Sequence, residues 1–286
     1  MTLLVRNEED IIADNIKYHS QVGVDAFVVL DNASDDSTPD VVKSLQDDFE
    51  IDLLFEPEKT YQQRQWVTKI AFHAKDKLGA DWVFSNDADE FWVPKSGSLK
   101  TGLDRKGSII RCSRYNMMVS REVVESNGPY YDYVLRMNNP IQWVNESNEF
   151  LKAMATYLRE VPENVAVNAH GLIKMLSGNH SAWHIARAFN RRWSENISIY
   201  HYPIRAYERF EKKIADRRQL LRTPGARKKL GGRYDEWVDL FEKGKLREEY
   251  EQFLLSDQDV LVLKKFGVLQ VDTTGKDAIE RVLEGR

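Results

Sequence analysis

The sequence is short of cysteine and of long apolar runs, and each shortage narrows the possible functions. Cys112 is the only cysteine among 286 residues, so the chain can form neither an internal disulfide nor a cysteine-based zinc site. No apolar stretch approaches the roughly 20 residues that span a bilayer, and the first residues lack the long apolar region of a signal peptide. We therefore expect a cytoplasmic protein, and peripheral contact with the inner face of a membrane stays open.

Several motifs of nucleotide and acyl chemistry are also missing. Neither Gly-x-Gly-x-x-Gly nor Gly-x-x-x-x-Gly-Lys-Ser/Thr occurs, which argues against a dinucleotide fold and a phosphate-binding loop. A Gly-x-Ser-x-Gly nucleophile elbow is absent as well, so serine-based acyl chemistry has no support. The formal net charge of −4 argues against wholesale nucleic-acid binding. With 42% hydrophobic and 30% charged residues, the composition is that of a globular protein.

Strand and helix patterns alternate through the first third of the chain. Short apolar runs predict four strands, at 3–5, 26–30, 51–55 and 82–84. Helical spacing predicts three helices between them, over 8–22, 38–47 and 61–78. The order β-α-β-α-β-α-β predicts an α/β fold with a parallel sheet covered by helices. Ligands of such sheets bind at the carboxyl ends of the strands.

Acidic residues follow two of these predicted strands. Asp31 comes directly after the second strand, and Asp87 and Asp89 come after the fourth. In an extended backbone, residues at i and i+2 point to the same side, so the two carboxylates repel each other unless a cation relieves the repulsion. Mg²⁺ and Mn²⁺ prefer such oxygen ligands. The sequence therefore predicts a metal site at this edge, with an acidic turn in water as the alternative.

Three blocks of sequence carry a resemblance to a known family. They are Val5-Arg6-Asn7-Glu8-Glu9, the run from Asp31 to Thr38, and Asp87-Ala88-Asp89-Glu90-Phe91. In this order they resemble the signature blocks of family-2-like glycosyltransferases with the GT-A fold. The third block and the segment 201–213 are similar to the bacterial branch related to family 92. The resemblance covers roughly residues 1–215.

The resemblance implies a Rossmann-like, mostly parallel sheet flanked by helices, a nucleotide-diphosphate-sugar donor with a UDP-sugar favoured, and Mn²⁺ or Mg²⁺. By position, it implies that the nucleotide sugar is bound by Arg6, Asn7, Glu8, Asp31, Arg64 and Asp87. It implies a metal site formed by Asp87, Asp89 and His180. The acceptor site, or an alternative metal ligand, would come from His184, His201 and Trp143. A cation and an arginine would stabilise the negative charge of a departing diphosphate.

An inverting transfer also needs a general base that takes the proton of the acceptor hydroxyl. Glu149 and Glu146 are the candidates, and Asp132 is a weaker third. A retaining mechanism would need no such base, and the sequence leaves both open. Aromatic residues are frequent between 115 and 150, where they could stack on an acceptor sugar or pack in a core.

We expect a GT-A domain over 1–204, with a nucleotide-sugar half at 1–110 and an acceptor half at 111–204, followed by a helical extension at 205–286. Residues 205–233 hold eleven Lys/Arg against three Asp/Glu, and residues 234–259 hold nine acidic against three basic residues. These segments predict a helical hairpin in which the basic helix faces the acidic one. The alternative is that the basic segment forms a surface that binds anionic lipid. The region after 257 predicts a closing strand and helix, and a homo-oligomer contact there stays open.

These patterns predict a metal-dependent glycosyltransferase. It would move a sugar from a nucleotide-diphosphate donor to a hydroxyl of a glycan or lipid-linked saccharide, as in bacterial surface polysaccharide synthesis. The alternatives are a Mg²⁺-dependent phosphotransferase or phosphatase, whose acidic pair also follows an apolar strand, and a non-catalytic carbohydrate-binding protein with a transferase-like fold.

Overall fold

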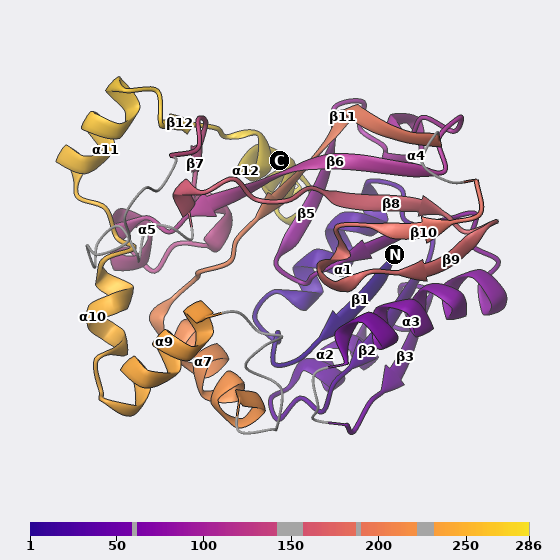
Figure 1. Ribbon diagram of the computed structural model, residues 1–286, viewed down its shortest axis with the longest axis horizontal. Coiled ribbons are helices and arrows are strands. Elements are labelled where there is room, and N and C mark those ends of the chain that lie inside the picture. The colour runs from indigo at the N-terminus through magenta and orange to yellow at the C-terminus, as the bar shows by residue number, and fades with distance from the viewer. Residues whose placement is uncertain (59–61, 142–156, 187–189, 222–231, 286) are drawn as a thin grey trace. The chain divides into compact units, whose positions relative to one another are not determined.

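A computed structural model describes residues 1–58, 62–141, 157–186, 190–221 and 232–285 (Figure 1). Its strands are β1 (Thr2–Val5), β2 (Phe27–Asp31), β3 (Ile51–Phe55), β4 (Trp82–Asn86), β5 (Glu90–Pro94), β6 (Ile109–Met118), β7 (Leu135–Met137), β8 (Asn164–Asn168), β9 (Leu172–Met175), β10 (Ala182–His184), β11 (Arg191–His201) and β12 (Leu269–Val271). Its helices are α1 (Ile12–Gln21), α2 (Thr38–Ser44), α3 (Gln63–Lys77), α4 (Leu99–Gly102), α5 (Arg121–Glu125), α7 (Tyr207–Leu221), α9 (Gly232–Glu242), α10 (Leu246–Glu251), α11 (Asp257–Lys265) and α12 (Thr274–Leu283), with short 3₁₀ turns η1 (Tyr130–Asp132) and η2 (Ser177–Asn179).

The chain divides into two compact units. Unit 1 comprises Met1–Arg114, Pro162–His201 and Ala278–Arg286, and unit 2 comprises Tyr115–Val161 and Tyr202–Asp277. In the described ranges no helix has the length and apolar character that a bilayer crossing requires.

The sheet of unit 1 has the strand order β6-β8-β4-β1-β2-β3. β3, β2, β1 and β4 are parallel to one another, and β8 runs antiparallel to both β4 and β6. The predicted β-α-β-α-β-α-β order therefore forms as expected, and the predicted α/β class is confirmed.

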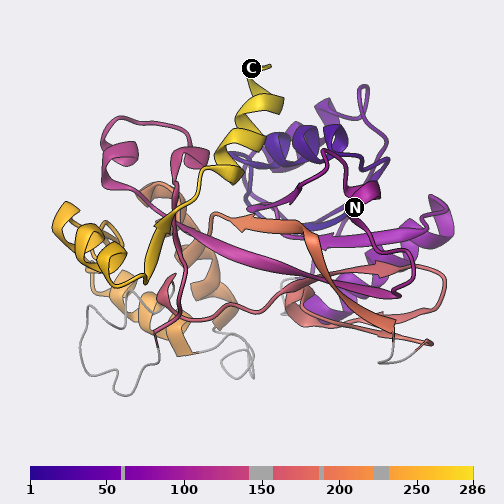
Figure 2. The ribbon, with the colours of Figure 1, turned by 90° about the horizontal axis from the view of Figure 1, so that it is seen from above.

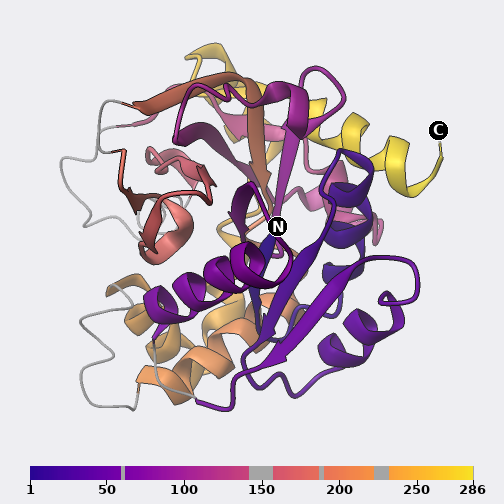
Figure 3. The same cartoon turned by 90° about the vertical axis from the view of Figure 1, so that its right-hand side faces the viewer.

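Helices cover both faces of the parallel strands. Figure 3 shows α3 on one face, and α1 and α2 on the other. The buried core beneath α3 gathers apolar side chains of the helix, of β2, β4, β6 and β8, and of the later hairpin: Val28, Leu30, Trp66, Val67, Ile70, Ala71, Ala74, Val83, Ile109, Val165, Val167, Ala169, Leu172, Met175 and Ala182. Alternate residues of β2 face this core, as expected for a strand with both faces covered.

A second strand follows the acidic turn directly. β5 begins at Glu90 and runs antiparallel to β11, with Trp92 opposite Ile199 and Glu90 opposite His201. β11 pairs with β6 as well, and Figure 2 shows β6 and β11 as long ribbons beside each other. The pairing with β5 places the last residue of β11 next to the acidic turn, although more than a hundred residues separate them in sequence.

A two-stranded hairpin, β9 and β10, lies against α3. Its first strand begins after Gly171, which has φ +128°. A Cβ at Gly171 would lie 2.6 Å from Cε1 of His184 and 2.7 Å from Cγ2 of Ile185. Only glycine meets both demands, since L side chains rarely adopt this φ. The hairpin turn, η2, ends at Asn179, itself in the left-handed region with φ 61°.

Unit 2 holds the end of β6, with β7 antiparallel to it and β12 antiparallel to β7. Most of its remaining described residues are helical, as predicted for the region after 205. The basic α7 packs against the acidic α9, and Nε of Arg218 lies 2.8 Å from Oε1 of Glu242. A closing strand and helix, β12 and α12, follow the additional helix α11.

Candidate functional site

The carboxyl ends of three neighbouring strands meet at one edge of the unit 1 sheet. β1 lies between β2 and β4, with Val5 opposite Asp31 and Leu3 opposite Asn86. The residues that end or directly follow these strands therefore share this edge. They include Arg6, Asp31 and Asp87, which sequence analysis placed at a single site.

The loops after β1 and β2 are locked together by hydrogen bonds. The backbone N–H of Asn7 donates to Oγ of Ser34 at 2.9 Å, and the N–H of Asp35 donates to Oδ1 of Asn7 at 2.9 Å. The N–H of Glu8 donates to Oγ1 of Thr38 at 2.8 Å. Asn7 lies in the left-handed region with φ 57°, a conformation that asparagine tolerates better than most residues. The backbone N–H groups of Asn7 and Glu8 and the side chain of Asn7 thus help to fix the shape of this edge.

Asp31 and Arg6 carry polar atoms that no described residue satisfies. Asp31 is 2% exposed. Its Oδ2 accepts from the N–H of Ser34 at 3.2 Å, whereas its Oδ1 is buried without a hydrogen-bond partner in the described part of the chain. Nε and Nη1 of Arg6 are also buried and have no hydrogen-bond partner among the described residues. An unsatisfied buried polar group costs about 1–3 kcal/mol, or more when charged. A polar ligand could supply the hydrogen bonds that this carboxylate and this guanidinium lack.

The acidic turn between β4 and β5 presents its two carboxylates differently. Oδ1 of Asp87 accepts from Nδ2 of Asn179 at 3.0 Å, and Oγ of Ser85 holds that asparagine by donating to its Oδ1 at 2.6 Å. Asp89 is 4% exposed, and its Oδ1 lies 3.4 Å from Nε2 of His201. The antiparallel pairing of β5 with β11 brings His201 to this place.

Buried amides hold this turn from behind. Nδ2 of Asn15, on α1, donates to the carbonyls of Ala88 and Glu90 at 2.8 and 2.9 Å. Nδ2 of Asn86 donates to the same carbonyl of Glu90 at 3.1 Å and to Oδ1 of Asn15 at 3.3 Å. Oδ1 of Asn86 in turn accepts from Nε1 of Trp92 at 2.8 Å. These contacts give the carbonyls of Ala88 and Glu90 hydrogen-bond donors inside the protein.

His19 completes the same network. Its Nδ1 lies 2.8 Å from the carbonyl of Asn15 and 3.0 Å from its Oδ1, both acceptors, so Nδ1 carries the proton. Its Nε2 accepts from the backbone N–H of Trp92 at 3.1 Å. These partners fit only the neutral ring with the proton on Nδ1. Burial lowers the pKa of His19 to about 3, against a weaker raising effect of the Asn15 carbonyl.

A buried ion pair lies beside the turn. Oε1 of Glu90 accepts from Nη1 of Arg114 at 2.9 Å, and its Oε2 accepts from Nδ2 of Asn164 at 2.5 Å. Burial raises the pKa of Glu90 to about 8, Asp87 raises it further, and Arg114 opposes both. The carboxylate thus lies where a negative charge is costly, and Arg114 is the nearest cation that compensates it.

His180 is linked to this pair through Asn164. Nδ1 of His180 lies 2.8 Å from Oδ1 of Asn164 and 3.1 Å from the carbonyl of Glu163. Because both partners are acceptors, Nδ1 carries the proton and Nε2 keeps its lone pair. Burial lowers the pKa of His180 to about 4, and the nearby Arg114 and His201 lower it too. This is the neutral, oriented imidazole that metal ligation requires.

Arg64 is exposed in the first turn of α3, the helix that follows β3. His184 is buried in β10, and its Nδ1 accepts from the N–H of Ala186 at 3.1 Å. Asp132 is paired with Lys276 in unit 2. Trp143, Glu146 and Glu149 fall outside the described residues, so their roles stay predictions. Asn15, Asn179 and Asn164 were not predicted as site residues, because no motif marks a lone amide. Glu90 belongs to the third motif block but was given no role in the site.

The donor set suits a cation that substrate oxygens would complete. Within the described ranges, no group of three or more His, Cys, Asp or Glu side chains is arranged to hold a metal ion. The contact between Asp89 and His201 supplies one carboxylate and one imidazole. Mg²⁺ is usually held by one or two carboxylates together with substrate phosphates. The residues therefore fit a cation that arrives with a phosphate-bearing ligand.

Comparison with known proteins gives only distant structural likenesses. Neither a protein-family profile nor a curated protein sequence matches the chain. The S. aureus TarS fragment 1–349 in complex with UDP-GlcNAc is 11% identical over 100% of this chain and 91% of that one, with a TM-score of 0.46. A longer S. aureus TarS structure is 10% identical over 85% of this chain but only 42% of its own length, with a TM-score of 0.42.

Glucosyl-3-phosphoglycerate synthase from Mycobacterium tuberculosis, in complex with Mn²⁺, UDP and glucosyl-3-phosphoglycerate, is 15% identical. It covers 77% of this chain and 76% of that one, with a TM-score of 0.36. At these values the function of this chain has to be argued from its own residues.

Proposed function

We propose that this protein is a GT-A-type glycosyltransferase that moves a sugar from a nucleotide-diphosphate donor to an acceptor hydroxyl. The observation that carries the proposal is the set of unsatisfied, buried polar atoms of Asp31 and Arg6 at the same sheet edge as the Asp89–His201 contact. The atoms of Asp31 and Arg6 suit the hydrogen-bonding groups of a base and ribose. The Asp89–His201 contact suits a cation bound to phosphates.

Each residue then has a distinct part. Oδ1 of Asp31 accepts a hydrogen bond from the nucleoside, and the guanidinium of Arg6 donates to its acceptor atoms. Asp89 and His201 would hold the divalent cation, Mn²⁺ or Mg²⁺, and substrate oxygens would complete its set of ligands. Bound there, the cation would neutralise charge on the departing diphosphate. Asn179 fixes Asp87 beside the cation site.

The reaction is a substitution at the anomeric carbon. The acceptor oxygen forms a bond to that carbon as the bond to the phosphate oxygen breaks, and the nucleoside diphosphate leaves with the electron pair. In the inverting form the acceptor's proton passes to a carboxylate, for which Glu149 and Glu146 stay the predicted bases. A UDP-sugar donor and a glycan or lipid-linked acceptor, as in bacterial surface polysaccharide synthesis, belong to this proposal.

Thermal shift with UDP, with and without Mn²⁺, tests the proposal, because a ligand of the folded state raises its melting temperature. We expect UDP with Mn²⁺ to stabilise the wild-type protein. Asp89→Asn should abolish the Mn²⁺-dependent part, and Asp31→Asn should weaken nucleotide binding with and without the metal. Asp81→Asn is the matched control, because the side chain of Asp81 is 82% exposed.

A chromatographic assay of UDP release from a panel of UDP-sugars then measures turnover. The proposal fails if Asp31→Asn and Asp89→Asn both respond to UDP and Mn²⁺ as the control does. Hydrolysis of p-nitrophenyl phosphate, without release of UDP from any UDP-sugar, would favour the phosphatase alternative instead.

A further inference from the structure

One stretch of unit 1 lacks acidic residues altogether. Residues 164–194 contain no Asp or Glu, although the whole chain has 45 of them and a net charge of −4. The stretch holds four Lys/Arg, of which Lys174, Arg191 and Arg192 are described. It contains the β9–β10 hairpin and the start of β11. A local excess of positive charge in an acidic protein indicates a negatively charged partner.

The same hairpin exposes large apolar side chains. Ile173 is 51% exposed, Trp183 54% and Ile185 72%. Trp183 and Ile185 are two residues apart, whereas their neighbours Ala182 and His184 are buried. Because the inner side chains of the hairpin belong to the core beneath α3, the hairpin is a firm support and its outer face is a fixed feature. We call Ile173, Lys174, Trp183 and Ile185 the hairpin face.

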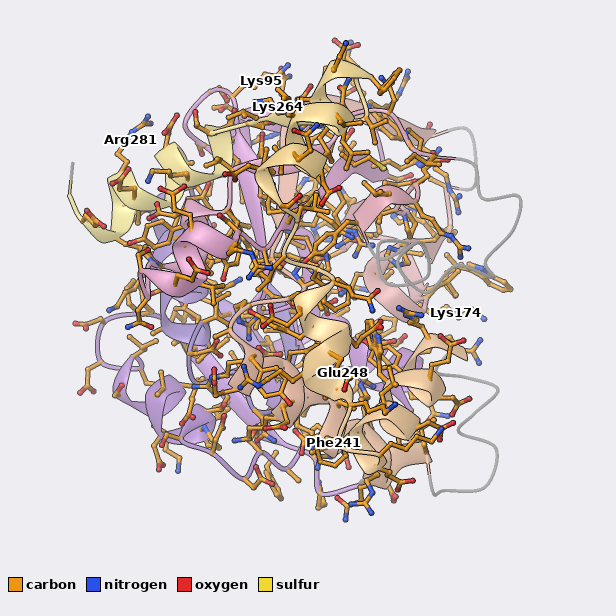
Figure 4. All side chains as sticks on the ribbon, turned by 90° about the vertical axis from the view of Figure 1, so that its left-hand side faces the viewer. Lys95, Lys174, Phe241, Glu248, Lys264 and Arg281 are labelled. Carbon is orange, nitrogen blue, oxygen red and sulfur yellow. The ribbon has the colours of Figure 1, made fainter. Side chains whose placement is uncertain are left out.

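Cations are interleaved with these apolar groups. Lys174 is paired with Trp183 across the hairpin, and its Nζ lies 3.6 Å from the centroid of the tryptophan ring. Figure 4 shows Lys174 reaching outward at the margin of the molecule. Nη2 of Arg191 lies 3.3 Å from both Oγ of Ser181 and the carbonyl of Ala182, so its guanidinium is held beside the start of β10. Arg192 is in part neutralised, since its Nε lies 4.0 Å from Asp104.

We propose that the hairpin face binds the surface of an anionic lipid bilayer. Trp183, Ile173 and Ile185 would enter the headgroup region, and Lys174 and Arg191 would meet lipid phosphates. Tryptophan is enriched at the membrane–water interface, and basic residues near an anionic surface each add about 1 kcal/mol to binding.

A bilayer fits better than a glycan. Ile185, the most exposed of the group, gains nothing from stacking on a sugar but gains from leaving water. The missing acidic residues remove the repulsion that anionic lipid would otherwise meet. This inference goes beyond the proposed function and does not depend on it, because vesicle binding is measured without any donor.

Sedimentation with vesicles tests the proposal on the full chain. We expect the wild-type protein to pellet with vesicles of equal parts phosphatidylcholine and phosphatidylglycerol, and far less with phosphatidylcholine alone. The double variant Trp183→Ser/Ile185→Ser should bind at least tenfold more weakly, which corresponds to about 1.4 kcal/mol. Lys174→Ala should reduce binding and its dependence on salt. Phe266→Ser is the matched control, because Phe266 is 75% exposed on the other unit.

A second measurement separates insertion from a purely ionic contact. Lipids brominated in their acyl chains should quench tryptophan fluorescence of the wild-type protein. They should quench Trp183→Phe much less, although this variant still pellets with the vesicles. Melting curves of all variants establish that each is folded.

Three results would overturn the inference. The first is equal pelleting of the wild-type protein with neutral and anionic vesicles. The second is unchanged binding of the double variant, which would indicate an ionic contact of the kind an anionic glycan makes. The third is a dimer in gel filtration that the double variant dissociates, without vesicle binding, which would assign the hairpin face to a second copy of the chain.

Discussion

The free energy of unfolding should fall at acid pH because His19 is buried in its neutral form. The ring accepts a hydrogen bond from the N–H of Trp92 at Nε2 and donates from Nδ1 to Asn15, so the folded state has no place for a second proton. Burial lowers the pKa of His19 to about 3, whereas an unfolded chain gives histidine about 6.5. The unfolded state therefore takes up a proton below about pH 6.5 that the folded state refuses until about pH 3.

The sign follows from this difference in proton uptake. Stability is fully present above pH 6.5 and falls as the pH drops towards 3, because the unfolded state binds more protons in that window. At about 1.36 kcal/mol per pH unit, lowering the pH from 7.5 to 5 should remove about 2 kcal/mol through His19 alone. The Met1 amine, whose pKa burial lowers to about 5, and His180 add to the slope of the wild-type protein.

Urea unfolding at both pH values, followed by tryptophan fluorescence, isolates the His19 contribution. His19→Gln should be less stable at pH 7.5, yet it should lose about 2 kcal/mol less than the wild-type protein between pH 7.5 and 5. His170→Gln is the matched control, because His170 is exposed and pairs with Asp81 at the surface. Equal losses in the wild-type protein and in His19→Gln would show that this reasoning about the buried ring is wrong.

Three further substitutions test the supports of the site by the same urea assay. Gly171→Ala should lower the free energy of unfolding by about 3 kcal/mol, because it combines a strained φ with a contact against His184. The control Gly79→Ala, also at positive φ but with open space around it, should lower it by about 1 kcal/mol. Similar losses in the two variants would show that packing against His184 does not matter. Asn15→Ala should cost about 3 kcal/mol by leaving the carbonyl of Ala88 unpaired, and a cost under about 1 kcal/mol would contradict the network. Arg114→Met should cost about 1–3 kcal/mol, since it leaves Oε1 of the buried Glu90 without its donor; a neutral or stabilising effect would show that the pair is not needed.

Local patterns in the sequence were sufficient to predict the parallel half of the fold. Apolar runs followed by helical spacing determine the order of elements, and the order determines which strand ends share an edge. Asp31 and Asp87 could be placed there without knowing any contact. The helix over 8–22 was predicted too long at its start, because α1 begins at Ile12.

The parts that the sequence did not predict depend on long-range pairing. β5 was missed because Glu90 and Phe91 were assigned to a motif, and the strand exists through its pairing with β11. That pairing places His201 against Asp89. The support from Asn15 could not be predicted either, since its partners are backbone carbonyls more than seventy residues away. A single sequence carries no signal for such contacts.

The amides behind the acidic turn also bear on how an ion would be received. Because Asn15 and Asn86 clamp the main chain beneath Ala88 and Glu90, the loop acquires its shape when the chain folds. A cation that binds there would then meet carboxylates on a loop that is already ordered. Little of the free energy of binding would be lost to ordering that loop. Binding at this site would depend on the charge of the cation and on its preferred coordination geometry, because the loop would not have to rearrange.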